Sequence, residues 1–598
     1  MVTQALFARV NKQRRTTQST GHQQPAREKK QRILLVQSSS GELKWYPLVL
    51  ILTASAILRL WNLDQMPAGL HVDEAANAWN AYCLLKTGSD QHGVSWPVFY
   101  LQAFGDNRSS LFAYSLLPIQ AIGGLSVWTT RLLPAVAGIL AVFLIYRVGT
   151  IVFGVRVGLT AAGMLALNPW HLQQSRWGHE ASVVPVLILL PVSALLWAQL
   201  PFKVASKLRF QPLKAALAGA TIGICCYGYP AVRVFLPVFL VAVLLVSWGH
   251  WWNQLKTCPG MMASIFLILS LAVTLGPLLW KHLTDPEINK RGLTTMVWAN
   301  SDSLGARIHK ALDRYPGHFG LDFLFLNGDK DIALSPPPKT GLFLWDSIVW
   351  MILGVIVLFK TFASSWASRF LAVWLITYPI GDLIHRHVSL HSLRSLPGLC
   401  ALILLAALGM VYAGEWLWLR PRNVRWIVVL VVISAVAALN ARFLDVFYRG
   451  FYQSPDKRNV RYADDLIKAS EWLKPQLSSA EAVFCTTSMI AHPYVYTLIG
   501  MQYDPSQWLR DQRDFVKGPL PNGDYANEEE CVGYGKLHFI VGEFYTAALD
   551  RLSNNGRSDR VIFIVRPGEL NLENKIQPVQ VIEDRLGRKS LLVFDGHL

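Results

Sequence analysis

Charged residues are scarce in this sequence of 598 amino acids, of which 16% are Asp, Glu, Lys or Arg and 52% are hydrophobic. A typical soluble domain carries about 25% charged residues. The deficit falls in long apolar runs such as residues 137–146 and 183–196, which are typical of membrane-spanning helices. The composition therefore predicts a mainly α-helical, polytopic membrane protein rather than a soluble one.

Cysteine is also rare, and its seven occurrences show no metal-ligand spacing. Five lie in or near apolar segments. Cys485 and Cys531 lie in the more polar C-terminal region, where the sequence leaves a disulfide between them open. That region also lacks a glycine fingerprint, a nucleophile elbow and a zinc pattern. We therefore expect a protein without a metal or other cofactor.

Acidic residues are fewer than basic ones, so the net charge is +17. Residues 1–44 contain nine Lys or Arg and two acids, without the early apolar core of a signal peptide. We interpret them as a disordered basic tail beside an anionic membrane face. Nucleic-acid binding is the rival explanation of the charge. Because the basic residues are spread over the tail and short loops, membrane topology explains them more economically.

Loop charge decides the predicted topology. A segment at 109–124 is short for a span, which needs about 20 residues. If it lies on the outer surface, the inner loops carry twelve basic residues and no acid, as the positive-inside rule requires. This predicts a cytoplasmic N-terminus and outer loops at 62–128, 174–180 and 282–341 within a membrane domain of residues 45–442. The eleven predicted spans are 45–61, 129–149, 157–173, 181–200, 214–230, 231–249, 261–281, 342–360, 368–384, 395–416 and 425–441.

Residues 443–598 differ in character, because charge rises and the apolar runs shorten to strand length. The predicted strands are 482–486, 537–541, 561–565, 580–582 and 591–594, and the predicted helices are 461–473 and 544–552. Alternating strands and helices indicate an α/β domain. We interpret it as an extracytoplasmic accessory or acceptor-handling module.

An acidic pair, Asp73-Glu74, opens a short helical stretch after the first span. Acids in the first turn of a helix also favour its dipole, so the pair alone does not indicate catalysis. The context of the pair does indicate catalysis, because five arginines lie on the predicted outer face, where the positive-inside rule disfavours basic residues. These are Arg108, Arg131, Arg176, Arg233 and Arg394. Snorkelling explains any one of them, but five together with Asp73, Glu74 and Glu180 suit an anionic phosphate headgroup.

The chemistry follows from these residue types. A sugar on a lipid phosphate has a good leaving group once arginines neutralise the charge that develops on it. The acceptor hydroxyl loses a proton as it attacks, and a carboxylate can take that proton. Neighbouring helical residues point about 100° apart, so only one acid of the pair should be the base. Among the predicted catalytic acids Asp73, Glu74 and Glu180, we assign Asp73 as the base and Glu74 an orienting role.

The order of these motifs resembles the GT-C membrane glycosyltransferases of family 39, which include protein O-mannosyltransferases, aminoarabinose transferases and rhizobial lipopolysaccharide-transferase-like proteins. The matching motifs are Asp73-Glu74, then Arg131-Leu132-Leu133-Pro134, then Pro169-Trp170-His171 followed by Ser175-Arg176 and Glu180. The resemblance implies inverting transfer from a polyprenyl-phosphate sugar to a lipid, glycan or protein, outside a bacterial inner membrane. It implies that Asp73 is the catalytic aspartate, Glu180 the second outer-loop acid and Arg131 the arginine of the second span.

One motif departs from that family. Asn107-Arg108-Ser109-Ser110 stands where many relatives have Lys-Pro-Pro or His-Pro-Pro, so Arg108 is expected to replace the lysine as a phosphate contact. The predicted donor-phosphate contacts are Arg108, Arg131, Arg176 and Arg394, and the predicted substrate contacts are His71, His179, Tyr229 and Arg233. An oligosaccharide ligase or lipid-phosphate transferase would share these arginines. A transporter or flippase would place charges at mid-membrane in paired repeats, and we find no repeat.

Overall fold

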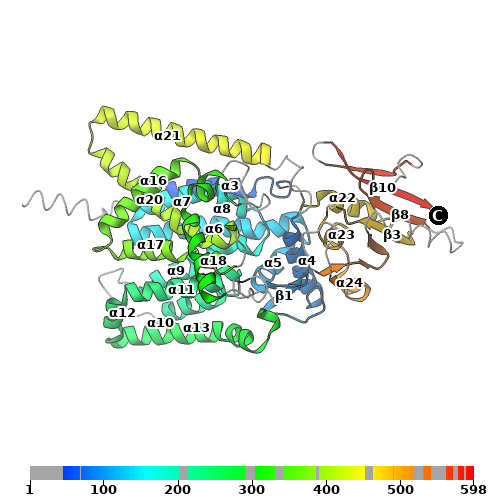
Figure 1. Ribbon diagram of the computed structural model, residues 1–598, viewed down its shortest axis with the longest axis horizontal. Helices are drawn as coiled ribbons and strands as arrows, with labels where there is room; N and C mark the ends of the chain where they lie inside the picture. The colour runs from blue at the N-terminus through cyan, green and yellow to red at the C-terminus, as the bar shows by residue number, and fades with distance from the viewer. Residues whose placement is uncertain are drawn as a thin grey trace, which may run out of the picture.

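The computed structural model describes residues 45–67, 69–200, 212–289, 296, 303–329, 341–385, 389–451, 462–488, 490–512, 515–517, 529–540, 560–569, 577–584 and 587–597. The predicted tail at 1–44 and the predicted helix at 544–552 lie outside them. Along the longest axis the structure has three parts: a helical bundle, an intermediate layer and a C-terminal α/β region (Figure 1). We call the end of the bundle that meets the intermediate layer its domain-facing end.

A helix occupies each of the eleven segments predicted to span the membrane. By length and hydropathy, five helical segments of the described chain can cross a membrane unaided, or six if α11 and α12, bent by 81°, form one span. The other predicted spans contain shorter helices. The bundle helices are α3 (Tyr46–Leu60), α6 (Val127–Phe153), α7 (Val155–Leu167), α9 (Val184–Trp197), α10 (Pro212–Cys225), α11 (Pro230–Val246), α12 (Trp248–Leu255), α13 (Cys258–Thr284), α16 (Asp346–Thr361), α17 (Trp366–Thr377), α20 (Leu399–Trp418) and α21 (Arg422–Asp445).

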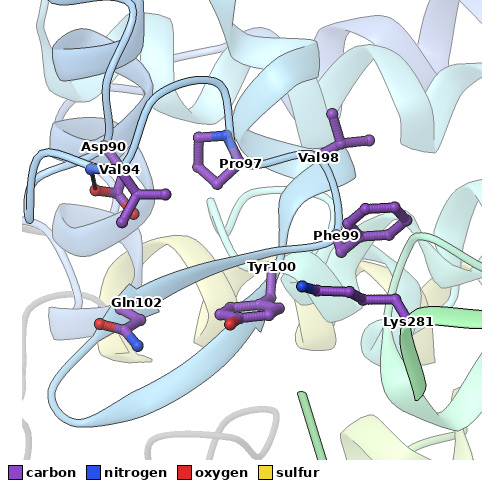
Figure 2. A pocket seen from close by; sticks show the side chains of 8 residues that line it. All are labelled: Asp90, Val94, Pro97, Val98, Phe99, Tyr100, Gln102 and Lys281. Carbon is purple, nitrogen blue, oxygen red and sulfur yellow. Dashed lines mark hydrogen bonds between the residues drawn. The ribbon is translucent and has the colours of Figure 1, made fainter. Parts of the chain in front are cut away.

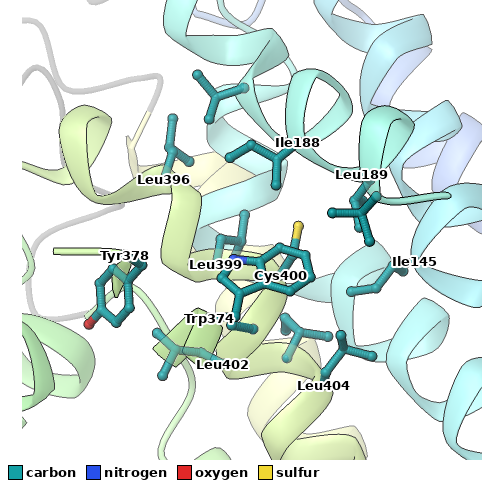
Figure 3. Close-up of a cluster of buried hydrophobic side chains, with 14 of the residues drawn as sticks. Ile145, Ile188, Leu189, Trp374, Tyr378, Leu396, Leu399, Cys400, Leu402 and Leu404 are labelled. Carbon is teal, nitrogen blue, oxygen red and sulfur yellow. The ribbon is translucent and has the colours of Figure 1, made fainter. Parts of the chain in front are cut away.

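A core of buried aliphatic and aromatic side chains joins α6, α7, α9, α17 and α20. Trp374 of α17 lies beside Leu399 and Cys400 of α20 within this core (Figure 3). Its indole Nε1 donates to the carbonyl of Pro397 at 2.8 Å, so the buried donor is satisfied. Pro397 belongs to the short turn η6 (Leu396–Gly398), which directly follows α19 (Ser392–Ser395). The core therefore anchors the turn next to Arg394.

The intermediate layer contains α4 (Val72–Thr87), a hairpin of β1 (Tyr100–Ala103) and β2 (Asp106–Ser109), and α5 (Ser110–Gly123). In Figure 1 these elements lie between the bundle and the C-terminal region. Helix α5 has 14 residues and packs against α4 and α6. Its place in this layer agrees with the prediction that segment 109–124 does not cross the bundle.

The C-terminal region is a six-stranded sheet with helices against it, and strands lie at all five predicted positions. The sheet order is β6-β7-β3-β8-β10-β9, in which β3 runs parallel to β7 and β8. These elements are β3 (Ala482–Thr486), β6 (Gly533–Tyr534), β7 (Leu537–Ile540), β8 (Arg560–Val565), β9 (Gln580–Glu583), β10 (Lys589–His597), α22 (Asp464–Leu473), α23 (Pro493–Met501) and α24 (Pro505–Asp511). A separate short pair, β4 (Phe515–Lys517) and β5 (Glu529–Cys531), lies outside the sheet order.

The two cysteines of this region are buried thiols, and no disulfide joins them. Cys485 lies on β3 and Cys531 at the end of β5. Each sulfur donates to a nearby backbone carbonyl, Cys485 to Thr486 and Cys531 to Gly533. Apolar packing therefore stabilises this region without a covalent link between the two cysteines.

The C-terminal region and α4 share one hydrophobic core. Trp508 of α24 is fully buried, and its Nε1 donates to the carbonyl of Gln91 at 2.8 Å. Gly69 has a φ of +64°, and a Cβ there would lie 2.5 Å from the backbone nitrogen of Asp464. This close approach and the shared core hold α4 rigidly against the C-terminal region.

Gly69→Ala is therefore expected to destabilise the junction. The added methyl meets the Asp464 backbone, and overpacking of this kind costs about 1–3 kcal/mol. Gly568→Ala is the matched control, because Gly568 also has a positive φ, +80°, but no atom within 4 Å of its added Cβ. Thermal unfolding followed by tryptophan fluorescence should show a lower midpoint for Gly69→Ala than for Gly568→Ala. Equal midpoints would show that the junction tolerates the methyl.

Candidate functional site

Helix α4 presents the acidic pair in its first turn. His71 is the N-cap, and its Nδ1 accepts a hydrogen bond from the backbone N–H of Asp73 at 3.2 Å. The backbone N–H of His71 in turn donates to Oε2 of Glu74 at 2.8 Å. This capping box satisfies donors that a helix start leaves open. Of the two acids, Glu74 is therefore the one whose side chain stabilises the start of the helix.

Glu74 is fully buried in an ion pair with Arg131. Nε of Arg131 lies 2.9 Å from Oε1 of Glu74, and Nη2 lies 3.0 Å from Oε2. Both side chains are 0% exposed. The backbone N–H of Gly178 also donates to Oε1 at 2.7 Å. Arg131, Gly178 and His71 occupy both oxygens of this buried carboxylate, a geometry that fits the orienting role.

Arg131 and Arg176 do not have the geometry predicted for donor-phosphate contacts. Arg131 also donates to the backbone carbonyls of Leu63, Pro67 and Gly69. Arg176 is likewise 0% exposed. It donates to the carbonyls of Leu58, Arg59, Asn62 and Met66. Arg176 binds carbonyls of the last turn of α3, where a helix leaves acceptors unpaired, and of the loop that follows, whereas Arg131 binds carbonyls of that loop. Their burial makes them structural supports of the site.

Asp73 is the accessible acid of the site, with 19% of its side chain exposed. Oδ1 lies 2.7 Å from Nη2 of Arg108, which comes from β2. Oδ2 lies 3.5 Å from Nδ1 of His71 and 3.5 Å from Nε2 of His179. The structure thus brings four predicted site residues together around one carboxylate. Because Asp73 is the acid of this group that solvent reaches, it has the geometry of a base.

His179 and Glu180 lie next to Asp73, with His179 between the two acids. The backbone N–H of Ala181 donates to Nδ1 of His179 at 2.9 Å, which leaves Nε2–H directed toward the acids. Burial lowers the pKa of His179, and the charges of Glu180 and Asp73 act in the opposite direction. Glu180 is 3% exposed. Among the described residues, its Oε1 has no hydrogen-bond partner. A buried carboxylate oxygen without a hydrogen bond is costly, so this position suits a ligand hydroxyl that donates a hydrogen bond to it.

Tyr229 and Arg233 bring the start of α11 to the same site. The Tyr229 ring lies edge-on to His179, with 5.9 Å between ring centroids. Nη2 of Arg233 donates to Oγ of Ser109 at 3.1 Å, and its Nε donates to the carbonyl of Cys226. Ser109 directly follows Arg108. The two predicted substrate contacts therefore border the Asp73 group, Tyr229 on the imidazole side and Arg233 on the hairpin side.

A second group of charged residues surrounds the fully buried Asp382. Nε2 of His318 lies 3.2 Å from Oδ2 of Asp382, and Nη2 of Arg314 lies 3.7 Å from the same oxygen. Nη1 of the predicted phosphate contact Arg394 lies 3.9 Å from Oδ1. Arg394 sits in α19, which packs against the turn η1 (Glu180–Val183). The two charged groups are therefore neighbours at the domain-facing end.

The C-terminal region supplies residues that the sequence did not indicate. Tyr462 forms a bridge with His71, and their rings lie 5.2 Å apart. His492 stacks on Phe104 at 3.8 Å, and the Phe104 ring lies under the Arg108 guanidinium at 5.3 Å. The C-terminal region thus supports two of the three partners of Asp73, His71 directly and Arg108 through Phe104. Burial, and then the charges of Asp73 and Glu74, raise the pKa of a third residue, Tyr496 of α23, well above its ordinary value.

Asp382 could have been found from the sequence, because it is an acid inside a predicted span, where ionisable residues mark functional or paired sites. Tyr462, His492 and Tyr496 lie about 400 residues from α4 in the chain, and no local pattern connects them to it. Their contribution depends on how the C-terminal region docks.

A cavity of about 160 Å³ lies between the loop before β1 and the end of α13. Figure 2 shows Lys281 of α13 beside Tyr100 of β1. The Tyr100 hydroxyl donates to Asp285 at 3.3 Å, and Asp285 pairs with Lys281 at 2.8 Å. None of the predicted site residues lines this cavity. The site around Asp73 is therefore separate from it.

Solved structures share this architecture. Two crystal structures of ArnT from Cupriavidus metallidurans, one bound to undecaprenyl phosphate and one in the apo state, cover 92% of this chain and 97% of their own. Both have a TM-score of 0.52, with sequence identities of 13% and 14%. The apo oligosaccharyltransferase of Archaeoglobus fulgidus covers 88% of this chain and 70% of its own, at 13% identity and a TM-score of 0.48. No family model and no curated protein sequence matches the chain.

The ArnT alignment extends over nearly the whole of both chains, bundle and C-terminal region together. The chain has the GT-C fold. This confirms the predicted fold class, a polytopic helical membrane protein with a C-terminal sheet region. At 13% identity the likeness concerns the fold, so the roles of individual residues in this protein depend on its own geometry. Membership of family 39 stays a prediction.

Proposed function

We propose that this GT-C protein is an integral-membrane glycosyltransferase that moves a sugar from a polyprenyl phosphate to an acceptor hydroxyl, with inversion. The observation that carries the proposal is the accessible Asp73 carboxylate paired with Arg108 at 2.7 Å, beside the arginines of the Asp382 group. The ArnT structure bound to undecaprenyl phosphate is consistent with a donor of this class. The reaction would occur at the outer face of a bacterial inner membrane, with the N-terminus in the cytoplasm.

The transfer would be a single displacement. The acceptor oxygen attacks the anomeric carbon, the bond from that carbon to the phosphate oxygen breaks, and polyprenyl phosphate leaves. The hydroxyl proton passes to Oδ2 of Asp73, the oxygen turned toward His71 and His179 rather than toward Arg108. Attack opposite the leaving group inverts the anomeric centre. Glu180, whose Oε1 has no partner among the described residues, would accept a hydrogen bond from a sugar or acceptor hydroxyl.

The leaving phosphate would meet Arg108 and Arg394. Arg108 is 10% exposed and Arg394 is 12% exposed, whereas Arg131 and Arg176 are 0% exposed. A guanidinium binds two phosphate oxygens at once and stays charged at all relevant pH values. Two such groups neutralise the developing charge without a metal ion.

The direct test is transfer by purified protein in liposomes. Polyprenyl phosphates carrying radiolabelled hexoses or pentoses are supplied with bacterial envelope lipids and glycans as acceptors. We expect label in an envelope product and stoichiometric release of polyprenyl phosphate. Hydrolysis or movement of the lipid across the bilayer without any labelled product would overturn the proposal in favour of a flippase.

Arg394→Gln is expected to raise KM for the lipid donor about tenfold to a hundredfold, the value of one charge-assisted hydrogen bond of roughly 1.5–3 kcal/mol. The effect on KM should exceed that on kcat if Arg394 binds the phosphate in the ground state. Arg420→Gln is the control, because Arg420 is an exposed arginine just beyond the other end of α20. An unchanged KM for Arg394→Gln would remove this residue from the phosphate site.

A further inference from the structure

Helix α15 (Leu304–Arg314) is amphipathic and has no buried residue within the described structure. Its apolar side chains recur every four residues: Leu304 is 72% exposed, Ile308 51% and Leu312 64%. This spacing places them on one stripe of the helix. The other faces carry Arg307, His309, Lys310, Asp313 and Arg314. A soluble surface seldom leaves such a stripe exposed, so α15 needs an apolar partner.

The C-terminal end of α15 is tied to the bundle at a defined height. The Tyr315 hydroxyl donates to the carbonyl of Ile376 at 2.9 Å. Ile376 lies in the last turn of α17 and is 62% exposed on the bundle surface. Arg314 donates to the carbonyls of Asp382 and His385 at 2.6 and 2.8 Å. Helix α15 therefore ends beside the last turn of α17, at the domain-facing end of the bundle.

Exposed tryptophans also lie at the domain-facing end of the bundle. Trp61 follows α3, Trp128 begins α6, Trp280 lies near the end of α13 and Trp345 precedes α16. Their exposed fractions are 58%, 45%, 69% and 50%. Tryptophan and tyrosine gather at the level of lipid headgroups. The apolar surface also continues beyond α15 through Phe319 and Leu321, which are 40% and 57% exposed.

We propose that α15 is an interfacial helix that lies in the membrane leaflet on the side of the C-terminal region. Leu304, Ile308 and Leu312 enter the boundary of the acyl chains, and the basic residues meet anionic lipid headgroups. The charge of the helix supports a lipid partner, because Arg307 and Lys310 outnumber its single acid, Asp313, while Arg314 pairs with Asp382 of the bundle. The same helix ends at Arg314, so membrane binding would hold the Asp382 group at the height of lipid phosphates. The inference does not depend on the proposed transfer reaction.

Depth-dependent quenching tests this placement. Ile308→Cys and, as a matched control, Asp313→Cys each carry an environment-sensitive fluorophore in full-length protein reconstituted in phosphatidylcholine liposomes. The background contains Cys258→Ser, because Cys258 is exposed while the other six cysteines are buried. We expect nitroxide groups near the top of the acyl chains to quench position 308 several-fold more than position 313. Aqueous iodide should show the opposite order, because Asp313 lies about 140° away around the helix.

Equal quenching at both positions would overturn the proposal. So would shielding of position 308 from both quenchers, which would show that another part of the chain or a second copy covers the stripe. A second measurement uses liposomes with and without anionic phosphatidylglycerol. The fluorophore at position 308 should shift further to the blue with the anionic lipid, and Lys310→Glu should abolish that added shift. An added shift that survives Lys310→Glu would contradict the role of the basic face.

Discussion

Asp73→Asn is expected to lower kcat for sugar transfer by about 10²–10⁴-fold, the contribution of a positioned general base. The amide keeps the size of the carboxylate but cannot take the proton of the acceptor hydroxyl. Arg108, 2.7 Å away, still reaches the amide oxygen, so the fold and binding of the lipid donor should persist. The measurement is single-turnover release of polyprenyl phosphate from a radiolabelled lipid-linked sugar.

Asp64→Asn is the control for this experiment, because Asp64 is an exposed acid in the same loop as the site. It should turn over at the rate of the unmodified protein. Turnover by Asp73→Asn at that rate would refute the assignment of Asp73 as the base. Loss of donor binding together with transfer would instead assign Asp73 to the phosphate site through its pairing with Arg108.

Arg131→Met should have the largest effect on stability, a loss of about 3–5 kcal/mol, because it leaves the Glu74 charge buried without its partner. The carbonyls of Leu63, Pro67 and Gly69 lose their donors in the same step. A phosphate contact would behave differently, since its removal would raise KM for the donor and leave stability unchanged. Thermal unfolding followed by tryptophan fluorescence separates the two outcomes.

The double variant Glu74→Gln/Arg131→Met identifies the cause of that loss. Removing both charges eliminates the unpaired buried carboxylate, so the double variant should be more stable than Arg131→Met alone. The coupling is expected because the two side chains share hydrogen bonds of 2.9 and 3.0 Å. If the stability losses of the two single variants simply add in the double variant, the Glu74–Arg131 ion pair does not stabilise the site.

The bundle could be predicted because its signal is local. A span must satisfy its backbone hydrogen bonds within one apolar helix, so hydropathy along the chain identifies it. All eleven predicted spans contain helices, and the five C-terminal strands lie where short apolar runs predicted them. The short segment 109–124 was placed outside the bundle from loop charge, and α5 lies in the intermediate layer.

The sequence by itself also determined which residue types gather at one end of the molecule, since each loop follows from the order of the spans. It did not determine which arginine pairs with which acid. Glu74 and Arg131 are 57 residues apart, and only tertiary packing shows that they neutralise each other in a site with 0% exposure. A partly exposed Arg108 and a fully buried Arg131 look alike in sequence, because burial depends on what other segments cover.

The tertiary structure alone decided the contribution of the C-terminal region. His71 is backed by Tyr462, and Arg108 by Phe104 and His492, through ring contacts between segments almost 400 residues apart. No periodicity records such contacts, because they arise only when segments far apart in the chain pack together. Local chain chemistry therefore determined the helices, the strands and the candidate acids. Docking determined which acid remains open to a substrate, namely Asp73.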